Sequence, residues 1–236
     1  MAARITIEDE DRGTWTLLDD AVGASPARAL VVLAGAGFDP ARLRGEAARA
    51  GIVVAADAGA ALCLEAGLNP DAVVGDLDSL GEGTRARLDP AQLARAIDPE
   101  TNDLEKALAW IALHRPDATE VVLAAGGNVD GGRMDHAIAN LGPLLREPHG
   151  RLSMVDGEGR LFALRMGRAR LAGLAGRRLS FLSWSLHGVG VSEAGVRYPL
   201  EHAHLLLGGR GVSNEITGEE AAVTVHEGVA LVWVEA

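Results

Sequence analysis

The sequence predicts an α/β protein in two parts: a doubly wound, mostly parallel sheet domain over residues 1–158, then an antiparallel β-rich domain over residues 159–236. Up to about residue 158, short Val-rich runs alternate with longer amphipathic segments, which is typical of βα units. Beyond that point, short strand-like runs are separated by glycines. The length of 236 residues also fits two modest domains.

The expected strands of the first part are nearly continuous in hydrophobicity, as strands covered on both faces are. They lie at Ala29–Gly35, Ile52–Asp57, Ala72–Asp76, Glu120–Gly126 and Leu152–Asp156. Apolar residues at helical spacing predict helices between them, at Pro40–Ala50, Gly59–Ala66, Asp103–His114 and Asp135–Glu147. The alternation predicts a parallel sheet with all strand carboxyl ends at one edge.

The second part has the pattern of an antiparallel sandwich or half-barrel. Its expected strands are Leu161–Met166, Arg178–Trp184, Ala203–Leu207, Ala221–His226 and Val229–Glu235. Glu227-Gly228 predicts a tight hairpin turn between the last two.

Charge and composition exclude several classes of function. The net charge of -11 opposes binding to nucleic acid, because such affinity comes largely from Lys and Arg on phosphates. Cys63 is the only cysteine, which excludes an intrachain disulfide and a cysteine zinc cluster and fits a reducing cytoplasm. The N-terminus lacks a signal-peptide core, and the longest apolar run, Ala29–Phe38, is about half a membrane span. We expect a soluble, cytoplasmic protein without nucleic-acid or membrane partners.

An apolar strand runs directly into two carboxylates, Asp76 and Asp78, in the segment Gly75–Ser79. Side chains two apart on a strand share a face, so both could bind one hard cation if the extended conformation persists. This pattern favours a magnesium site, although Asp and Ser are also common in solvated turns.

A second acidic segment begins a helix. Asn102 fits the N-cap and Glu105 the third helical position, which places Asp103 in the first turn. An acid there also complements the helix dipole, which is a sufficient structural explanation by itself. Asp57 ends another predicted strand, and acids at several strand ends favour one common site.

The segment Gly126–His136 follows an apolar strand and opens a helix. A glycine-rich turn before a helix N-terminus presents backbone N–H groups to phosphate, and Arg133 adds a forked cation. It matches neither a P-loop nor a GxGxxG fingerprint. A flexible connection with Asp135 as a helix cap is the alternative.

Taken together and in this order, these segments resemble the thiamine pyrophosphokinase family. The matching pieces are ADAGAAL at Ala56–Leu62, GDLDS at Gly75–Ser79, NDLEKAL at Asn102–Leu108, GGRMDH at Gly131–His136 and GVSNEI at Gly211–Ile216. The resemblance implies an N-terminal α/β domain that binds ATP and Mg²⁺, and a C-terminal β-sandwich for thiamine binding and dimerisation. It also implies transfer of the pyrophosphoryl group of ATP to the hydroxyl of thiamine, with AMP released, in a homodimer whose active sites are shared between subunits.

The resemblance also implies roles for individual residues by their position in these motifs. The implied metal ligands are Asp76, Asp78 and Asp103, and these three form the catalytic set together with Arg133 and Asp135. Implied contacts to ATP come from Asp57, Gly59, Lys106, Arg133, His136 and Asn140. Implied contacts to thiamine come from Tyr198, Ser213 and Asn214.

The chain departs from the family pattern at three positions. The family often reads ADGGAN where this chain has Ala58 and Ala61, and often has Thr where Asn102 stands. Two alternatives follow: a pyrophosphokinase for another acceptor, such as a hydroxymethyl-pterin, or a non-catalytic nucleotide- or thiamine-binding sensor. Tyr198 and the SNE segment favour thiamine, and the full set of acids favours an enzyme.

Overall fold

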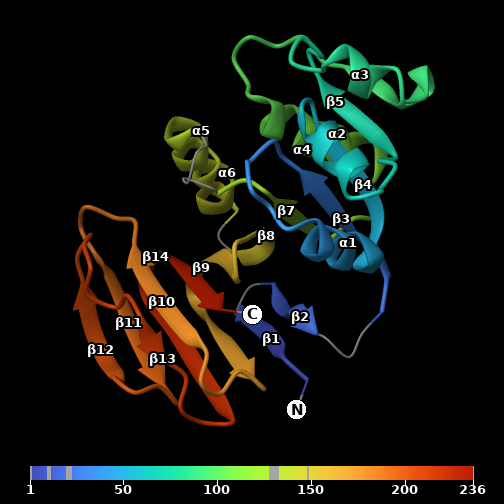
Figure 1. The fold of residues 1–236 in the computed structure, drawn as a ribbon. Helices are drawn as coiled ribbons and strands as arrows, with labels where there is room; N and C mark the ends of the chain where they lie inside the picture. The colour runs from blue at the N-terminus through green and yellow to red at the C-terminus, as the bar shows by residue number, and fades with distance from the viewer. Residues whose placement is uncertain (1, 10–11, 20–22, 128–132, 148, 236) are drawn as a thin grey trace. The chain divides into compact units, whose positions relative to one another are not determined.

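The computed structural model describes residues 2–9, 12–19, 23–127, 133–147 and 149–235. These residues form two compact units. The first unit combines residues 1–22, 143–153 and 158–236, and the second combines residues 23–142 and 154–157. We call them the β unit and the α/β unit (Figure 1).

The α/β unit is built on five parallel strands in the order β7-β3-β4-β5-β6. These are β3 (Ser25–Val32), β4 (Ala50–Ala56), β5 (Ala72–Gly75), β6 (Leu93–Arg95) and β7 (Glu120–Ala124). The chain adds β4, β5 and β6 on one side of β3 and then returns to add β7 on the other side. The strand order therefore reverses between β3 and β7, and such a switch point is where open α/β sheets bind ligands.

Helices lie between these strands, and two more follow β7. They are α1 (Pro40–Arg49), α2 (Gly59–Glu65), α3 (Glu82–Arg85), a 3₁₀ turn (Pro90–Gln92), α4 (Asp103–His114), α5 (Met134–Ala139) and α6 (Leu141–Arg146). Leu43 of α1 and Cys63 of α2 share one buried cluster with Leu30 and Val32 of β3. Since α4 packs against β3, β4 and β5 with buried Leu104, the sheet carries apolar helical cover as the parallel pattern predicts.

The expected helix Asp135–Glu147 is wrong as a single element. The structure divides it into α5 and α6, and Asn140 lies at the break with helical backbone angles. Its side chain turns inward and donates from Nδ2 to the carbonyl of Gly126 at 2.9 Å. Pro143 lies three residues after Asn140 and lacks a backbone N–H, which is consistent with a new start at Leu141.

The β unit is antiparallel. Its strands are β1 (Arg4–Asp9), β2 (Gly13–Asp19), β9 (Gly159–Ala172), β10 (Arg178–Ser183), β11 (Val189–Ala194), β12 (Leu200–Leu205), β13 (Asn214–Glu215) and β14 (Glu220–Glu235). Strand β8 (His149–Asp156) is divided between the units: its residues up to Ser153 cluster with the β unit, and those from Met154 cluster with the α/β unit. The long strands β9 and β14 pair along most of their length, and β14 also pairs with β10 and β11. A single apolar cluster joins Ile5, Phe162, Phe181 and Val223, so strands from all parts of the unit share one core.

The predicted hairpin at Glu227-Gly228 is wrong, because β14 continues through these residues as one strand. The pairing with β9 shifts register between Val225 and Val229, which marks a bulge. Gly228 has a φ of 81°, a left-handed conformation that glycine adopts without strain. The glycine therefore allows a bulge within the strand rather than a reversal of the chain.

A division at residue 158 does not describe the compact units. β1 pairs with β9 from Arg4↔Ala172 to Asp9↔Gly167, so the first strands of the chain belong to the β unit. Residues 143–153 also cluster with that unit. Sequence patterns report local structure, whereas this pairing joins segments far apart in the chain. Of the described helices, none combines the length and apolar character that crossing a membrane requires.

Glu193 occupies an inward position of β11, in line with the buried Val189 and Val191. Its side chain is 2% exposed, and its Oε2 accepts a hydrogen bond of 3.0 Å from Nδ2 of Asn214. Burial raises the pKa of Glu193 to about 7, although the hydrogen bond from Asn214 opposes the shift. The fold therefore binds a proton at this carboxyl more tightly than the unfolded chain does.

We expect this carboxyl to make the stability of the protein depend on pH. Its contribution is fully present below the ordinary pKa of 4.5 and is lost as pH rises to about 7, because the folded form binds the proton more tightly. Glu193→Gln removes the titrating group and keeps the shape. The melting temperature of the wild type minus that of Glu193→Gln should fall steadily with rising pH over this range. A difference that stays constant with pH would contradict the expectation.

Candidate active site

A cavity of about 420 Å³ opens at the carboxyl end of the parallel strands. Its walls come from the segments after β3, β4 and β7, from the start of α4, and from α5 with its flanking residues. The lining includes Gly35, Ala58, Ser79, Asn102, Asp103, Gly126, Arg133, His136 and Asn140. The cavity therefore lies at the switch point of the sheet, the position that the strand order favours for a ligand.

Asp57 follows the last residue of β4 and has a φ of 41°, so the chain turns sharply there. Its backbone N–H donates to the carbonyl of Val74 at 2.9 Å, which ties it to the neighbouring strand. The side chain is 1% exposed, and neither carboxylate oxygen has a hydrogen-bond partner among the described residues. A buried carboxylate without a partner is costly, so its oxygens are suited to a cation.

Burial raises the pKa of Asp57 to about 6, and the negative charge of Asp103 adds to the shift. The nearby Ser79 amide opposes it without forming a hydrogen bond of normal geometry. The space around it is also restricted. A Cβ at Gly75 would lie 2.9 Å from Cβ of Asp57 and 3.3 Å from Oδ1 of Asp103. Glycine at the end of β5 therefore leaves room for Asp57, Asp103 and the GDLDS segment to lie close together.

Asp76 and Asp78 lie just beyond β5, but the geometry expected for them is wrong. The strand ends at Gly75, and Leu77 has a φ of 66°, so the backbone between the two acids is not extended. Instead, the amide of Asp78 donates to Oδ1 of Asp76 at 3.2 Å in a tight turn. This bond is the main cause that lowers the pKa of Asp76.

The two acids nevertheless converge with Asp57. Asp57, Asp76 and Asp78 each offer one oxygen, and these oxygens all lie within 4.8 Å of one another. Carboxylate oxygens at this separation suit a hard divalent cation such as Mg²⁺. The trio differs from the implied set Asp76, Asp78 and Asp103, since Asp57 takes the place of Asp103.

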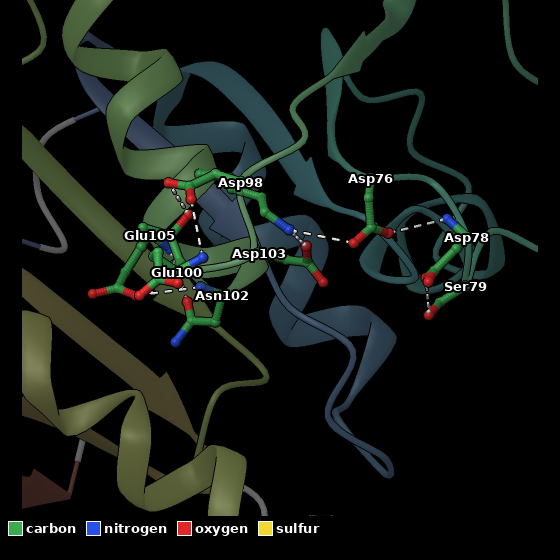
Figure 2. A network of polar contacts seen from close by, with 10 residues as sticks. Asp76, Asp78, Ser79, Asp98, Glu100, Asn102, Asp103 and Glu105 are labelled. Carbon is green, nitrogen blue, oxygen red and sulfur yellow. Dashed lines mark hydrogen bonds and ion pairs between the residues drawn. The ribbon is translucent and has the colours of Figure 1, made fainter.

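Asp103 lies at the start of α4, on the side of the GDLDS segment where Asp76 lies (Figure 2). The predicted capping box is present: Oδ1 of Asn102 accepts from the Glu105 amide at 2.9 Å, and Oε2 of Glu105 accepts from the Asn102 amide at 3.3 Å. Nζ of Lys106 lies 3.1 Å from Oδ1 of Asp103 and 3.4 Å from Oδ2 of Asp76. The lysine therefore links the helix to the acids of the GDLDS segment.

Burial by itself would lower the pKa of Lys106, but the hydrogen bonds and negative charges of Asp103 and Asp76 outweigh it and raise the pKa. Lys106 is 8% exposed and stays cationic. The site thus combines a buried cation with a group of carboxylates, which is the arrangement that holds a metal and phosphates together.

Arg133 also lines the cavity, and Asp135 forms an ion pair with it. Nε and Nη2 of Arg133 donate to the two carboxylate oxygens of Asp135 at 2.9 and 2.5 Å. The pair is exposed, and the guanidinium lowers the pKa of Asp135 to about 2. Asp135 therefore orients Arg133. The glycine-rich turn at residues 128–132, including Gly131 and Gly132 of the GGRMDH piece, lies outside the described residues.

The remaining implied ATP contacts fall into two groups. His136 and Asn140 line the cavity, and Asn140 holds the carbonyl of Gly126 there. Gly59 is buried, and a Cβ on it would lie 2.0 Å from the carbonyl oxygen of Val32. The structure therefore gives Gly59 a packing role, in which α2 approaches β3 closely, rather than a place in the cavity lining.

The residues implied for thiamine lie in the β unit. Tyr198 is 67% exposed, and Ser213 is exposed with a φ of 60°. Asn214 is 5% exposed, and its carboxamide makes hydrogen bonds within the protein. Tyr198 and Ser213 are thus accessible to a ligand, whereas Asn214 is part of the supporting structure.

Sequence reasoning missed two residues that the structure brings forward. Ser79 lines the cavity, and its place directly after Asp78 in GDLDS was an available signal. The sequence indicates Glu193 less clearly: its only unusual feature is that an acid occupies a position that alternation with Val189 and Val191 places in the core.

Comparisons with known proteins agree with the order of these motifs. The thiamin pyrophosphokinase catalytic-domain family matches residues 44–155, and the thiamin pyrophosphokinase vitamin B1 binding-domain family matches residues 170–230. A thiamine pyrophosphokinase of Bacillus subtilis (strain 168) is 25% identical over 185 residues, which are 75% of this chain and 84% of that protein. Thiamine pyrophosphokinase 3 of Oryza sativa subsp. japonica is 23% identical over 174 residues, 70% of this chain and 65% of the rice protein.

Solved structures show the same fold. The crystal structure of thiamine pyrophosphokinase from Bacillus subtilis matches with a TM-score of 0.75 and 22% identity, over 88% of this chain and 99% of the other. Thiamin pyrophosphokinase from Candida albicans matches with a TM-score of 0.74 and 18% identity, over 88% of each chain. The match includes the cavity-bearing unit and the antiparallel strands.

Proposed function

The chain belongs to the thiamine pyrophosphokinase family, and from this premise we propose that it transfers the pyrophosphoryl group of ATP to the hydroxyl of thiamine at the cavity of the α/β unit. The thiamine oxygen forms a bond to the β-phosphorus, the bond from that phosphorus to the α-phosphate oxygen breaks, and AMP leaves. The vitamin B1 binding-domain match over residues 170–230 argues against a pterin acceptor.

The observation that carries the proposal is the trio Asp57, Asp76 and Asp78 at the same sheet edge as the cavity. The buried, unpartnered oxygens of Asp57 fit a cation, since a cation would offset the cost of burying them. We assign the trio to Mg²⁺, with Asp103 held beside it through Lys106. When bound, Mg²⁺ neutralises phosphate charge and orients the transferring group.

The other cavity residues position the nucleotide and stabilise charge. Lys106 and Arg133 supply two cations near the phosphates, and His136 and Asn140 line the same cavity. Phosphoryl transfer depends on positioning and charge neutralisation more than on a strong base. Oδ1 of Asp103 accepts from Lys106, so we assign Oδ2 to receive the proton of the thiamine hydroxyl.

For thiamine, we propose that the exposed ring of Tyr198 stacks on the vitamin and that Ser213 lies beside it. Asn214 holds the backbone of Tyr198 through hydrogen bonds to its N–H and C=O. We further propose a homodimer in which Tyr198 of one subunit serves the acids of the other, as the resemblance implies. The reaction belongs where ATP and Mg²⁺ are plentiful, and we assign it to the cytoplasm.

The products test the proposal. With ATP, Mg²⁺ and thiamine, the purified protein should form thiamine diphosphate and AMP in equal amounts, because attack falls on the β-phosphorus. Mass spectrometry of the products measures both, and a reaction without thiamine serves as the control. Formation of ADP with thiamine monophosphate would contradict the bond assignment. Thiamine binding without any turnover would favour the sensor instead.

A further inference from the structure

The carboxamide of Asn214 uses its full hydrogen-bonding capacity inside the protein. Its Nδ2 donates to Oε2 of Glu193 at 3.0 Å and to the carbonyl of Tyr198 at 2.9 Å. Its Oδ1 accepts from the amides of Tyr198 and Glu215, both at 3.0 Å. A carboxamide has two donor hydrogens and two acceptor positions, so this one has none left for a ligand.

These bonds fix the backbone that carries Tyr198. Asn214 holds both the N–H and the C=O of Tyr198, and the Arg197 amide donates to the carbonyl of Glu215 at 2.8 Å. Val196 forms an isolated bridge with Ile216. The main chain of residues 196–198 is therefore attached along residues 214–216, while Tyr198 as a whole is 67% exposed. An exposed ring on an immobilised backbone is prepared for stacking at little cost in entropy.

Glu193 completes this arrangement from within the core. It occupies an inward position in line with Val191, where the neighbouring buried side chains of the strand are apolar. Only Oε2 is paired, and Oε1 has no hydrogen-bond partner among the residues that the structure describes. Removing such a carboxylate would relieve the core of an unsatisfied atom. Stability alone therefore does not explain its presence.

The carboxylate does determine how the carboxamide is oriented. Oε2 of Glu193 accepts the hydrogen bond from Nδ2, so this oxygen favours the NH₂ end of Asn214 at that position and disfavours Oδ1 there. That orientation is the one in which Nδ2 faces the carbonyl of Tyr198 and Oδ1 faces its amide. The reversed carboxamide would lose all of these bonds together.

We propose that Glu193 is a positioning residue for thiamine, which acts through Asn214 to hold Tyr198 in the orientation that stacks on the substrate. The inference rests on the proposed function, in which Tyr198 contacts thiamine. Glu193 itself does not touch the substrate. Its effect is on thiamine recognition and not on ATP.

The test uses the full-length enzyme and steady-state kinetics with thiamine varied at saturating ATP and Mg²⁺. Glu193→Leu removes the acceptor, and we expect the thiamine KM to rise about fivefold or more, the scale of one lost hydrogen bond, with kcat and the ATP KM little changed. Glu193→Gln retains an acceptor oxygen, so its thiamine KM should stay within about twofold of wild type. If both variants raise the KM equally, charge and not positioning is responsible, and the proposal is wrong.

Val191→Ala is the matched control, because Val191 lies on the same strand and face and the change removes buried volume but no hydrogen bond of Asn214. It should lower the melting temperature and leave the thiamine KM unchanged. If Val191→Ala raises the thiamine KM as much as Glu193→Leu does, the effect of Glu193 comes from packing in general, and the proposal is wrong. If Glu193→Leu does not fold, Glu193→Ala in the same assay gives the same comparison.

A double-mutant comparison separates this inference from the proposed function. In a Tyr198→Ala background, Glu193→Leu should produce no further rise in the thiamine KM, because both changes act on the same ring. A full additional rise would show that Glu193 acts by another route. If Tyr198→Ala alone leaves the KM unchanged, the role of Tyr198 fails. If wild type makes no thiamine diphosphate, the proposed function fails.

Discussion

Asp78→Asn is expected to lower turnover by at least about a hundredfold while the melting temperature changes little. The substitution keeps the shape of the side chain and removes one of the three charges that converge within 4.8 Å. Asp78 is exposed and contributes no apolar packing, so the fold does not depend on its charge. Initial rates at several Mg²⁺ concentrations, together with thermal melts, measure the two effects.

Asp71→Asn is a suitable control, because Asp71 lies just before the other end of the same strand, β5. Its Oδ2 accepts from the amide of Val53 at 2.8 Å, a bond that the Asn oxygen can keep. Turnover of this variant should equal that of the wild type. Near-normal turnover of Asp78→Asn at saturating Mg²⁺ would instead mean that GDLDS is a structural turn.

Tyr198→Ala is expected to raise the thiamine KM by about tenfold or more, from the loss of cation–π attraction and stacking area against a cationic, planar substrate. The ATP KM should change little, since the cavity is in the α/β unit and Tyr198 belongs to the β unit. Tyr198→Phe keeps the ring and serves as the control. A tenfold effect of Tyr198→Phe would point to the hydroxyl instead of the ring.

Mixing two variants tests whether the site is shared between subunits. Asp78→Asn and Tyr198→Ala are each weak at low thiamine, but a heterodimer would contain one site with both native residues. If subunits exchange randomly, about a quarter of the wild-type sites return, because half of the dimers are mixed and each has one complete site. A mixture that exchanges subunits and shows no gain would mean that each site is built within one chain.

The acidic edge of the parallel sheet, with Asp57, Asp76, Asp78 and Asp103, could be predicted from the sequence because it depends on short local patterns. The Val-rich strands, the capping box at Asn102 and the acids at strand ends each follow from short patterns, and the structure brings them to one edge. The positions of the acids relative to one another could not be predicted from short sequence patterns. Leu77 adopts a left-handed conformation, and Asp57 brings an oxygen within 4.8 Å of oxygens of Asp76 and Asp78. Both features depend on how neighbouring strands pack.

The antiparallel unit was less predictable for the same reason. Glu227-Gly228 is a hairpin signal by composition, yet β14 has partners on both sides of the glycine that keep it extended. The strands at residues 4–9 and 13–19 precede the α/β pattern and were not assigned, because only pairing with β9 shows where they belong.

That pairing has a consequence for how the chain is made. Glu8 and Arg170 meet across a sequence separation of 162 residues, so the first hairpin leaves the ribosome long before its partner strand exists. The parallel strands within residues 23–142 emerge in between, whereas the antiparallel unit lacks its last strands until the end of synthesis. Removing the first strands would therefore take away part of the β unit, which is completed last, and none of the α/β unit.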